Sequence, residues 1–383
     1  MRAFLSAYLV LLLASQPARA RIWRVEAAGT GDAPTIQAAI DSAAAGDEIV
    51  VGPGTYRWSQ QGHTADYGMI FFDRGVGGFT LRSEEGPLTT ILDAEHQGRV
   101  MFIMAYNELT IDGFTFRNGN APPDYDSGGG LIGHLSAPVI RNCTFTGNTA
   151  HNGGGLWYGG VSAPVIEDCI FIDNHADNGG GVCLVNSSTA ARLVRCLALG
   201  NTATNRGGGI FVYHYTAQLE GCTLAHNEAG TSGGGLCLQE AYPSTATGCT
   251  IVENAAPEGG GLHCKYGSDL LVTRSVFAWA HEGGALGMGE ECLLEVGCCL
   301  LYGNAGGDSL PAGAVDAGHN LELDPQFCGV KGSRNWTVQA DSPCLPFNHP
   351  EGLLCQRIGA WPAGCGTVGT ERSSWGSIRK IAR

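Results

Sequence analysis

The sequence is poor in positive charge, in long apolar runs and in the short motifs that mark many enzymes. It carries 22 Lys and Arg against 36 Asp and Glu in 383 residues, a formal net charge of −14, which argues against a role in nucleic-acid binding. After the first 20 residues, no segment approaches the run of about 18 apolar residues that a membrane-spanning helix needs. No phosphate-binding loop, HExxH or GxSxG motif occurs in its required context, so these enzyme classes are not indicated.

Glycine and cysteine are, in contrast, abundant, with 59 and 15 residues. The glycines lack the period of three that collagen requires, and a hydrophobic content of 44% is too high for a disordered chain. The length would normally correspond to two or three domains, unless one elongated array accounts for it.

The first 20 residues have the features of a secretory signal. Arg2 supplies a positive start, Ala3–Ala14 an apolar run, and Ala18–Ala20 a cleavage site of the A-x-A type. We therefore expect a secreted protein, extracellular or at the cell surface; the alternative is an N-terminal anchor that is never cleaved. Fifteen cysteines in an exported chain indicate disulfides, and the odd number leaves at least one thiol unpaired or bonded to another chain.

A repeat of 25 to 28 residues dominates the sequence. Glycine triplets begin at Gly128, Gly153, Gly179, Gly207, Gly233 and Gly259. Between them recurs a segment with Cys at its start and Asn at its end, at Cys143–Asn148, Cys169–Asn174, Cys196–Asn201, Cys222–Asn227 and Cys249–Asn254. Short apolar segments bounded by Gly and Asn at such a period predict a parallel β-solenoid of roughly nine coils.

Stacking of the coils assigns a role to each repeated residue. Coils about 4.7–4.9 Å apart would align like residues into a cysteine ladder, an apolar ladder and an asparagine ladder. We interpret the asparagines as corner residues that bond to neighbouring coils rather than as ligands, and the cysteines as buried thiols rather than a metal site. The glycines would supply positive φ or close backbone approach.

An amphipathic helix is expected over Thr35–Ala44, ended by Gly46 and followed by a strand at Glu48–Val51 and a turn at Pro53-Gly54. Such a helix would plug the open apolar end of the solenoid. The whole segment Thr35–Tyr56 resembles the first segment of right-handed parallel β-helix proteins of the pectin-lyase-like superfamily.

Two further resemblances extend to about residue 345. The pairing of glycine triplets with Phe-x-x-Asn, as in Phe145–Asn148 and Phe171–Asn174, is similar to repeats of polymorphic outer-membrane proteins. Asp324–Phe327, Asn335–Val338 and Ser342–Cys344 resemble the closing segment of many secreted β-helix proteins. This superfamily contains lyases, hydrolases, esterases, adhesins and phage tailspikes, so the resemblance implies a fold without selecting an activity.

We therefore predict an all-β chain, a single-stranded right-handed parallel β-helix with an N-terminal capping helix and a disulfide-clipped C-terminal segment. The expected divisions are a signal peptide at 1–20, a cap at 21–62, the β-helix at 63–345 and a tail at 346–383. Two disulfides are expected among the cysteines of the irregular C-terminal part, with their connectivity open: Cys328, Cys344, Cys355 and Cys365.

Three sets of residues are candidates for a site. Asp126, His151, Asp177 and Arg206 precede successive glycine triplets and form a predicted rim that could perform acid–base chemistry on a glycosidic or uronate substrate. Polar residues are also what exposed turns ordinarily contain, which is the alternative interpretation. Asp124 and Asp126 could bind Ca²⁺, against the alternative of solvated turn carboxylates.

The third set is aromatic. If the first apolar residue after each triplet points inward, Trp157, Phe211, Tyr213 and Tyr215 are expected on one outer face. Aromatic rings stack on sugar faces, so this face predicts a carbohydrate-binding flank. A face covered by a loop or a partner subunit, or ordinary exposed aromatics, are the alternatives.

The favoured hypothesis is a secreted or surface β-helix protein that binds an extended polysaccharide, or a cell-surface glycan, along its flank. The first alternative is a polysaccharide lyase or glycoside hydrolase that uses the rim, although the paired-Asp and arginine motifs of polygalacturonases and pectate lyases are not found. The second is an adhesin or structural surface protein. The sequence leaves the oligomeric state open.

Overall fold

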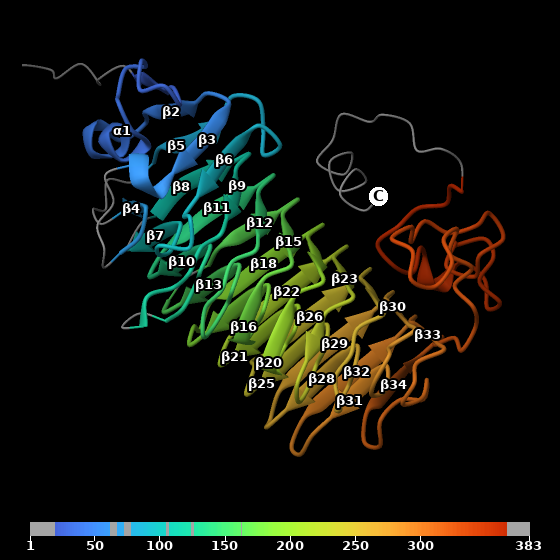
Figure 1. Ribbon diagram of the computed structural model, residues 1–383. Helices are drawn as coiled ribbons and strands as arrows, with labels where there is room; N and C mark the ends of the chain where they lie inside the picture. The colour runs from blue at the N-terminus through green and yellow to red at the C-terminus, as the bar shows by residue number, and fades with distance from the viewer. Residues whose placement is uncertain are drawn as a thin grey trace, which may run out of the picture.

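The computed structural model describes residues 20–61, 67–72, 78–104, 107–123, 126–161 and 163–365. These residues wind into an elongated parallel β-solenoid whose coils are stacked along one axis (Figure 1). Three long sheets run along that axis with 12, 9 and 10 strands, and a short sheet of 3 strands lies beside them. The predicted signal segment before Ala20 and the end of the predicted tail, after residue 365, lie outside the described residues.

Coils in the middle of the solenoid each contribute one strand to each long sheet, whereas the end coils do not contribute to all three. The twelve-stranded sheet consists of β1 (Ile22–Val25), β2 (Glu48–Val51), β5 (Thr80–Ser83), β8 (Asn107–Asp112), β11 (Ala137–Arg141), β14 (Val165–Glu167), β18 (Ala190–Val194), β22 (Thr216–Glu220), β26 (Ser244–Thr247), β29 (Asp269–Thr273), β32 (Leu293–Gly297) and β34 (Val315–Gly318). The nine-stranded sheet consists of β4 (Ile70–Phe72), β7 (Met101–Met104), β10 (Leu131–His134), β13 (Leu156–Gly159), β17 (Val182–Val185), β21 (Ile210–Tyr213), β25 (Leu236–Gln239), β28 (Leu262–Lys265) and β31 (Leu286–Met288).

The ten-stranded sheet consists of β3 (Gly54–Arg57), β6 (Thr90–Asp93), β9 (Thr115–Arg117), β12 (Thr144–Thr146), β15 (Ile170–Ile172), β19 (Leu197–Leu199), β23 (Thr223–Ala225), β27 (Thr250–Val252), β30 (Val276–Ala278) and β33 (Leu300–Tyr302). The short sheet consists of β16 (His175–Asn178), β20 (Thr202–Arg206) and β24 (Glu228–Ala229). All the pairings between these strands are parallel, as a solenoid requires.

The register confirms that residues one repeat apart lie over one another. Phe145 pairs with Phe171 between β12 and β15, and their rings stack with centroids 4.9 Å apart. The asparagine ladder is continuous, because each side-chain amide donates to the carbonyl oxygen of the next asparagine; Asn174 Nδ2 lies 2.9 Å from Asn201 Oδ1. The cysteine ladder is buried in the solenoid core, and burial raises the pKa of the Cys169 thiol. Both ladders are therefore structural, as the repeat predicted.

The glycine triplets satisfy two different backbone requirements. The first glycine of a triplet adopts positive φ, as at Gly233 with φ +63°. The second approaches the neighbouring coil closely: a Cβ on Gly234 would lie 2.5 Å from the Ala255 carbonyl oxygen. A side chain at the second position would collide with backbone, so the triplet permits the close packing of the coils at this bend.

A second bend lies between the ten-stranded sheet and the short sheet. The residue just before each asparagine of the ladder has a left-handed backbone conformation, and Trp279 takes the same position before Ala280. Their φ values lie between 53° and 64°. We call these residues the corner column, which comprises Gly147, Asp173, Gly200, His226, Glu253 and Trp279. A Cβ on Gly200 would lie 2.7 Å from Asp173 Oδ1, so side chains of this column reach the neighbouring corner. The solenoid thus brings the side chains of successive corners together.

Helix α1 (Ile36–Ser42) forms close to the predicted place. Thr35 caps its N-terminus by accepting a hydrogen bond from the Ala38 amide at 3.1 Å. Ile36, Ala39 and Ile40 are buried in the same core as the coils, and the helix packs beside β1, β2 and β4 (Figure 1). The apolar face of the helix therefore extends the solenoid core.

The C-terminal segment, coloured orange to red in Figure 1, carries two disulfides. They join Cys298 to Cys355 and Cys328 to Cys365. Two disulfides were expected, but Cys298 belongs to the last coils, and Cys344 is a buried free thiol instead of a disulfide partner. The Cys298–Cys355 bond therefore ties the C-terminal segment to the coils. Cys355 ends the short 3-10 helix η3 (Leu353–Cys355) of that segment. A further 3-10 helix, η1 (Trp58–Gln60), lies near the N-terminus.

The same segment packs on the outer face of the ten-stranded sheet. Trp336 and Trp361 are buried in a second apolar cluster with outward-facing residues of β19, β27 and β30. Trp361 Nε1 donates to Thr223 Oγ1 of β23 at 2.9 Å. The C-terminal segment thus covers one flank of the solenoid and leaves the flank formed by the nine-stranded sheet to other uses.

Candidate functional site

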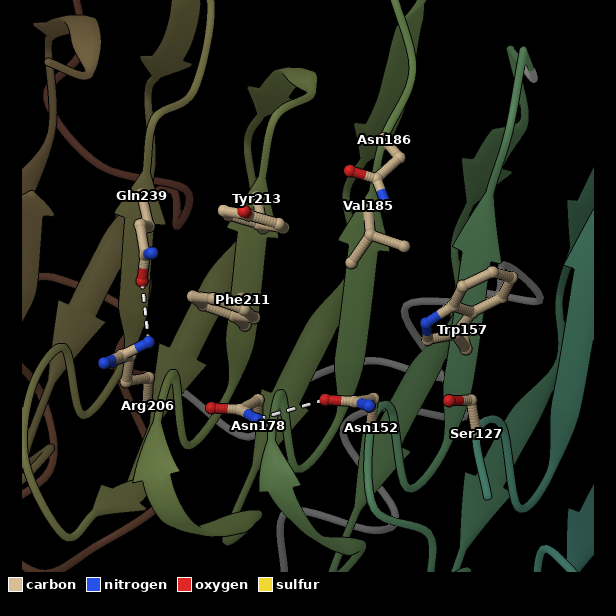
Figure 2. Close-up of a pocket in the computed structure, with 10 residues that line it drawn as sticks. All are labelled: Ser127, Asn152, Trp157, Asn178, Val185, Asn186, Arg206, Phe211, Tyr213 and Gln239. Atoms are coloured by element: carbon tan, nitrogen blue, oxygen red, sulfur yellow. Dashed lines mark hydrogen bonds between the residues drawn. The ribbon is translucent and has the colours of Figure 1, made fainter. Parts of the chain in front are cut away.

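A groove of about 480 Å³ lies on the outer face of the nine-stranded sheet (Figure 2). It crosses five adjacent strands, from the turn before β10 to the end of β25. Ten residues line it: Ser127, Asn152, Trp157, Asn178, Val185, Asn186, Arg206, Phe211, Tyr213 and Gln239. We call this feature the aromatic groove.

The floor of the groove is apolar. Phe211 of β21 is only 5% exposed and packs between Cys183 and Cys237 of the neighbouring strands. Tyr213 lies two residues further along β21, with its ring parallel to that of Phe211 and the centroids 6.4 Å apart. Strand alternation explains this row, because both side chains point away from the solenoid core. Phe211 is therefore a buried part of the floor rather than an exposed contact residue.

Trp157 forms one end of the aromatic groove, two strands away from Phe211. Its indole lies over Gly159, where an added Cβ would come within 2.2 Å of the ring. It also stacks on His134 of β10 with centroids 6.3 Å apart. Figure 2 shows the ring at the wall of the groove, with its nitrogen edge directed inward. The absence of a side chain at Gly159 thus creates the space that holds the indole.

Side chains from the bend before the glycine triplets form the opposite, polar wall. Asn178 Nδ2 donates to Asn152 Oδ1 at 3.1 Å, and Arg206 Nη1 donates to Gln239 Oε1 at 2.7 Å (Figure 2). Parallel bridges between the successive bends hold this row in register. The wall therefore offers amide donors and acceptors and one guanidinium, and none of the lining residues is acidic.

The structure places Tyr215 elsewhere than expected. Its side chain is fully buried in the solenoid core, and burial raises the pKa of its hydroxyl to about 12. The reason is His214, whose backbone has φ 47° and turns the chain directly after β21. This turn interrupts the strand alternation, so Tyr215 points inward and is not part of the outer aromatic face.

The predicted rim divides into two parts. Arg206 lines the aromatic groove, whereas Asp126, His151 and Asp177 are not among its lining residues. Each of these three precedes by one position a residue that lines the groove or its edge, and successive side chains of an extended chain point to opposite sides. The rim as predicted, with all four residues at one site, is therefore not formed.

His151 and Asp177 nevertheless form a pair of their own. His151 Nδ1 lies 2.7 Å from Asp177 Oδ2, and the Thr204 hydroxyl donates to Asp177 Oδ1, also at 2.7 Å. The hydrogen bond from Thr204, together with the imidazole, lowers the pKa of the Asp177 carboxyl. Both side chains are partly exposed, and a carboxylate on one ring nitrogen orients the other for proton transfer.

The predicted calcium ligands are Asp124 and Asp126. Asp124 lies outside the described residues, and Asp126 is exposed. The carbonyl of Asp126 accepts a hydrogen bond from the His151 amide at 2.6 Å, which joins the two bends. Desolvation lowers the pKa of the buried Arg99 to about 10, and the Asp126 carboxylate opposes this shift with a smaller effect.

The sequence interpretation missed the residues of the polar wall. Ser127, Asn152 and Asn178 form the repeat position directly before the glycine triplet, adjacent to the position that supplied the predicted rim. A count in steps of two from an outward residue identifies the outer face of a strand, but counting back from Trp157 leads to His151 rather than Asn152, because Gly153 with φ +63° interrupts the alternation. Val185 and Gln239 follow from the same count along their strands.

Comparisons with known proteins concern the fold. The family described as "Right handed beta helix region" matches residues 75–217 and 176–314. The solved structure of pectate lyase Pel9A superposes with a TM-score of 0.52 at 13% identity, covering 90% of this chain and 96% of that chain. Pectin methylesterase from carrot has a TM-score of 0.35 at 13% identity, covering 79% of this chain and 88% of that chain.

A search of curated proteins found no match. In the part of the chain that the structure describes, no helix has the length and apolar character needed to cross a bilayer. Identity as low as 13% shows the fold alone, whereas the family match spans more than half of the chain and agrees with the parallel coils. This chain belongs to the right-handed β-helix family.

Proposed function

We propose that the aromatic groove binds an extended polysaccharide. The observation that carries the proposal is the placement of two half-buried aromatic rings, Trp157 and Tyr213, opposite a row of side-chain amides. Aromatic faces pack against the apolar faces of sugar rings, while amides and a guanidinium hydrogen-bond to hydroxyl groups. Five adjacent strands span about 19 Å, four strand spacings, which suits a chain of several sugars better than a small ligand.

The charge of the lining limits the kind of polymer. Arg206 supplies the only formal charge among the lining residues, and its Gln239 contact leaves further N–H groups of the guanidinium for a ligand. A strongly anionic polymer would need more cations than one. The groove therefore favours a neutral polysaccharide, or one with an occasional carboxylate that Arg206 could meet in a bidentate pair.

Affinity electrophoresis through gels that contain a panel of polysaccharides tests this proposal. We expect retardation by at least one polymer, and a loss of affinity of about tenfold or more in a Trp157→Ala/Tyr213→Ala double variant. Phe347→Ala is the matched control, because Phe347 is 87% exposed and lies in the C-terminal segment. Retention that is equal in the double variant and the control contradicts binding in the groove.

The His151–Asp177 pair supports a second candidate function, that of a polysaccharide lyase or hydrolase. Asp177 stays a carboxylate and orients His151 Nδ1, which leaves Nε2 to accept or deliver a proton. We infer that Asp126, whose carboxylate is exposed in the adjoining bend, could bind Ca²⁺ together with Asp124. Ca²⁺ is therefore varied in the assays.

Assays for unsaturated uronate and for new reducing ends, over the same panel with and without Ca²⁺, test the enzymatic candidate. We expect any turnover to fall at least a hundredfold in His151→Asn and to persist in His96→Asn, which changes another exposed histidine. Turnover that survives in His151→Asn excludes this role for the pair.

Three further proposals concern the setting of the protein. The signal-like N-terminus and the two disulfides favour secretion, with a polysaccharide or a cell-surface glycan as the partner. The repeats similar to those of polymorphic outer-membrane proteins favour an adhesive surface role if no glycan binds. Packing of α1 on β1, β2 and β4 favours a role of this helix as the cap of the solenoid.

A further inference from the structure

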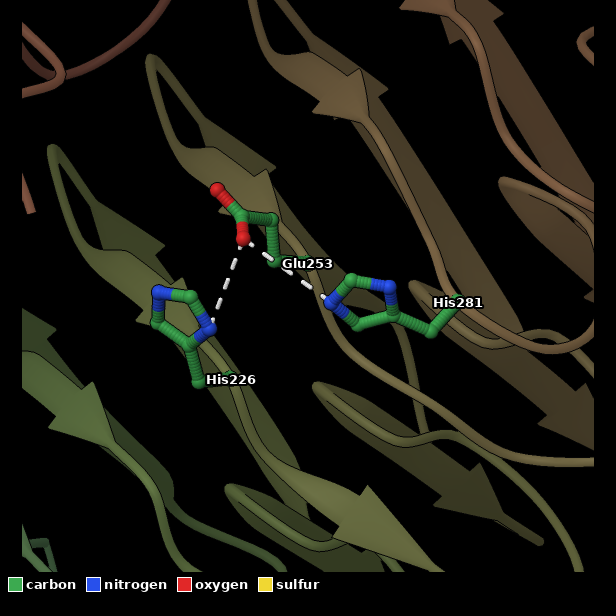
Figure 3. Close-up of side chains that lie close together, drawn as sticks. All are labelled: His226, Glu253 and His281. Carbon is green, nitrogen blue, oxygen red and sulfur yellow. Dashed lines mark ion pairs between the residues drawn. The ribbon is translucent and has the colours of Figure 1, made fainter. Parts of the chain in front are cut away.

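Three potential metal ligands, none of which lines the aromatic groove, lie close together at the bend that follows the ten-stranded sheet. His226 and Glu253 are successive members of the corner column, and His281 follows two residues after the next member. Their nearest ligand atoms all lie within 4.8 Å of one another. Figure 3 shows the two imidazoles directed at the same carboxylate from neighbouring coils.

The two histidines of the cluster lie near Glu253 but too far from it to form hydrogen bonds. His226 Nδ1 lies 3.6 Å from Glu253 Oε2, and His281 Nε2 lies 3.8 Å from the same oxygen. Both are longer than a hydrogen bond. The other ring nitrogen of His226, Nε2, is buried and has no hydrogen-bond partner among the described residues. The gap between His226 Nδ1 and Glu253 Oε2 is one that an ion bound to both atoms would fill.

Glu253 is the centre of the cluster and is almost completely buried, with 2% of the residue exposed. The Gly332 amide of the C-terminal segment donates to both of its oxygens, at 3.0 and 2.9 Å. One amide does not compensate a buried negative charge, so a cation beside the carboxylate would stabilise it.

We propose that His226 Nδ1, Glu253 Oε2 and His281 Nε2 form a binding site for a divalent transition-metal ion, and that Zn²⁺ fits it best. Two imidazoles and one carboxylate are a frequent ligand set for Zn²⁺, whereas Ca²⁺ and Mg²⁺ prefer sites made of oxygen alone. Bonds of about 2.0–2.1 Å place tetrahedral ligand atoms about 3.3 Å apart. The two measured separations of 3.6 and 3.8 Å therefore need to close by only a few tenths of an ångström.

The third separation, between the two histidines, must close further. His281 can provide this movement because its side chain is 49% exposed, while Glu253 is held by Gly332. Three protein ligands leave one tetrahedral position to solvent on the exposed side of His281. The site would join three successive coils, those of β23, β27 and β30, and through Glu253 it would also fix the C-terminal segment.

Zn²⁺ titration of the full-length, EDTA-treated protein, followed by calorimetry and by thermal unfolding, tests the site. We expect one Zn²⁺ per chain with a dissociation constant at or below the micromolar range. We also expect an unfolding temperature that rises with Zn²⁺ concentration, because an ion that binds only the folded state stabilises it. His281→Asn should weaken binding at least tenfold, since it removes one ligand of three from an exposed position.

Two further variants complete the experiment. His96→Asn changes an exposed histidine outside the cluster and should bind Zn²⁺ as the original protein does. Both histidine variants retain all free thiols, so Zn²⁺ bound by cysteines would not distinguish them. Glu253→Gln keeps an oxygen that can accept from Gly332 and should lose the ion while it retains the circular dichroism spectrum. Equal binding by His281→Asn and His96→Asn, or the lack of one tight site in the original protein, overturns the proposal.

Discussion

Replacement of Asn201 by alanine should measure how much the asparagine ladder stabilises the solenoid. Asn201 lies in the middle of the ladder and is fully buried. Its side-chain amide donates to Phe171 O and to Asn227 Oδ1, both at 2.9 Å. Its Oδ1 accepts from the backbone amide of Asn174 at 3.1 Å and from Asn174 Nδ2 at 2.9 Å. Alanine removes all four bonds.

The magnitude follows from the groups that lose a hydrogen-bond partner. Asn174 Nδ2 still donates to Phe145 O, and Asn227 Oδ1 still accepts from the Asn201 amide. The Asn174 amide and the Phe171 carbonyl lose these side-chain bonds inside a corner that excludes water. An unsatisfied buried group costs about 1–3 kcal/mol, so with the small cavity we expect a loss of about 3–5 kcal/mol.

Urea unfolding followed by circular dichroism and by tryptophan fluorescence gives the free energy of unfolding. Agreement of the two probes is required first, because solenoids can unfold in more than one step. Asn205→Ala is the matched control: it is four residues away, its side chain is exposed, and we expect a change within about 0.5 kcal/mol. If Asn201→Ala costs no more than this control, the ladder does not stabilise the fold and the reasoning is wrong.

Three further predictions address other features of the coils. Gly234→Ala should lower the unfolding midpoint more than Gly248→Ala. The first variant places a Cβ 2.5 Å from the Ala255 carbonyl oxygen, whereas the Cβ of the second meets nothing within 4 Å. The second variant is therefore destabilised only by its φ of +62°, which costs about 1–2 kcal/mol. A thiol reagent should label one cysteine of the folded protein quickly, Cys292, since the other free cysteines are buried, and mass spectrometry of the labelled peptide would reveal any different site. Burial lowers the pKa of His263 to about 4, below its unfolded value of about 6.5. The stability linked to this histidine is therefore complete above pH 6.5 and falls by roughly 3 kcal/mol as the pH drops to 4. His263→Gln should flatten that part of the curve of unfolding free energy against pH, and an unchanged slope would contradict the assignment.

The periodic features of this fold could be predicted because each depends on one residue type that recurs in every coil. The Cys169 and Asn174 positions bury a thiol and an amide in the same place in successive turns, so sequence spacing alone indicates their neighbours. Helix α1 was likewise predictable from local signals, the cap at Thr35 and one apolar face.

The orientation of side chains beyond the strand ends could not be read from spacing. Tyr215 was expected beside Tyr213, but the left-handed turn at His214 sends it into the core. His151 and Asp177 were expected to share a rim with Arg206, yet the alternation of the bend places Arg206 in the groove and leaves the other two paired. In both cases one backbone dihedral or one alternation step decides which side of the sheet a residue faces.

Sequence alone determined that this chain is a parallel solenoid, that its coils repeat about every 26 residues, and that aromatic residues gather on one flank. Only the tertiary structure decided that Glu253 is buried beneath Gly332 and faces two histidines, and that Cys298 rather than Cys344 forms a disulfide. The physical reason is the range of the interactions: stacking connects residues one period apart, whereas the C-terminal segment folds back over the coils by contacts that follow no period.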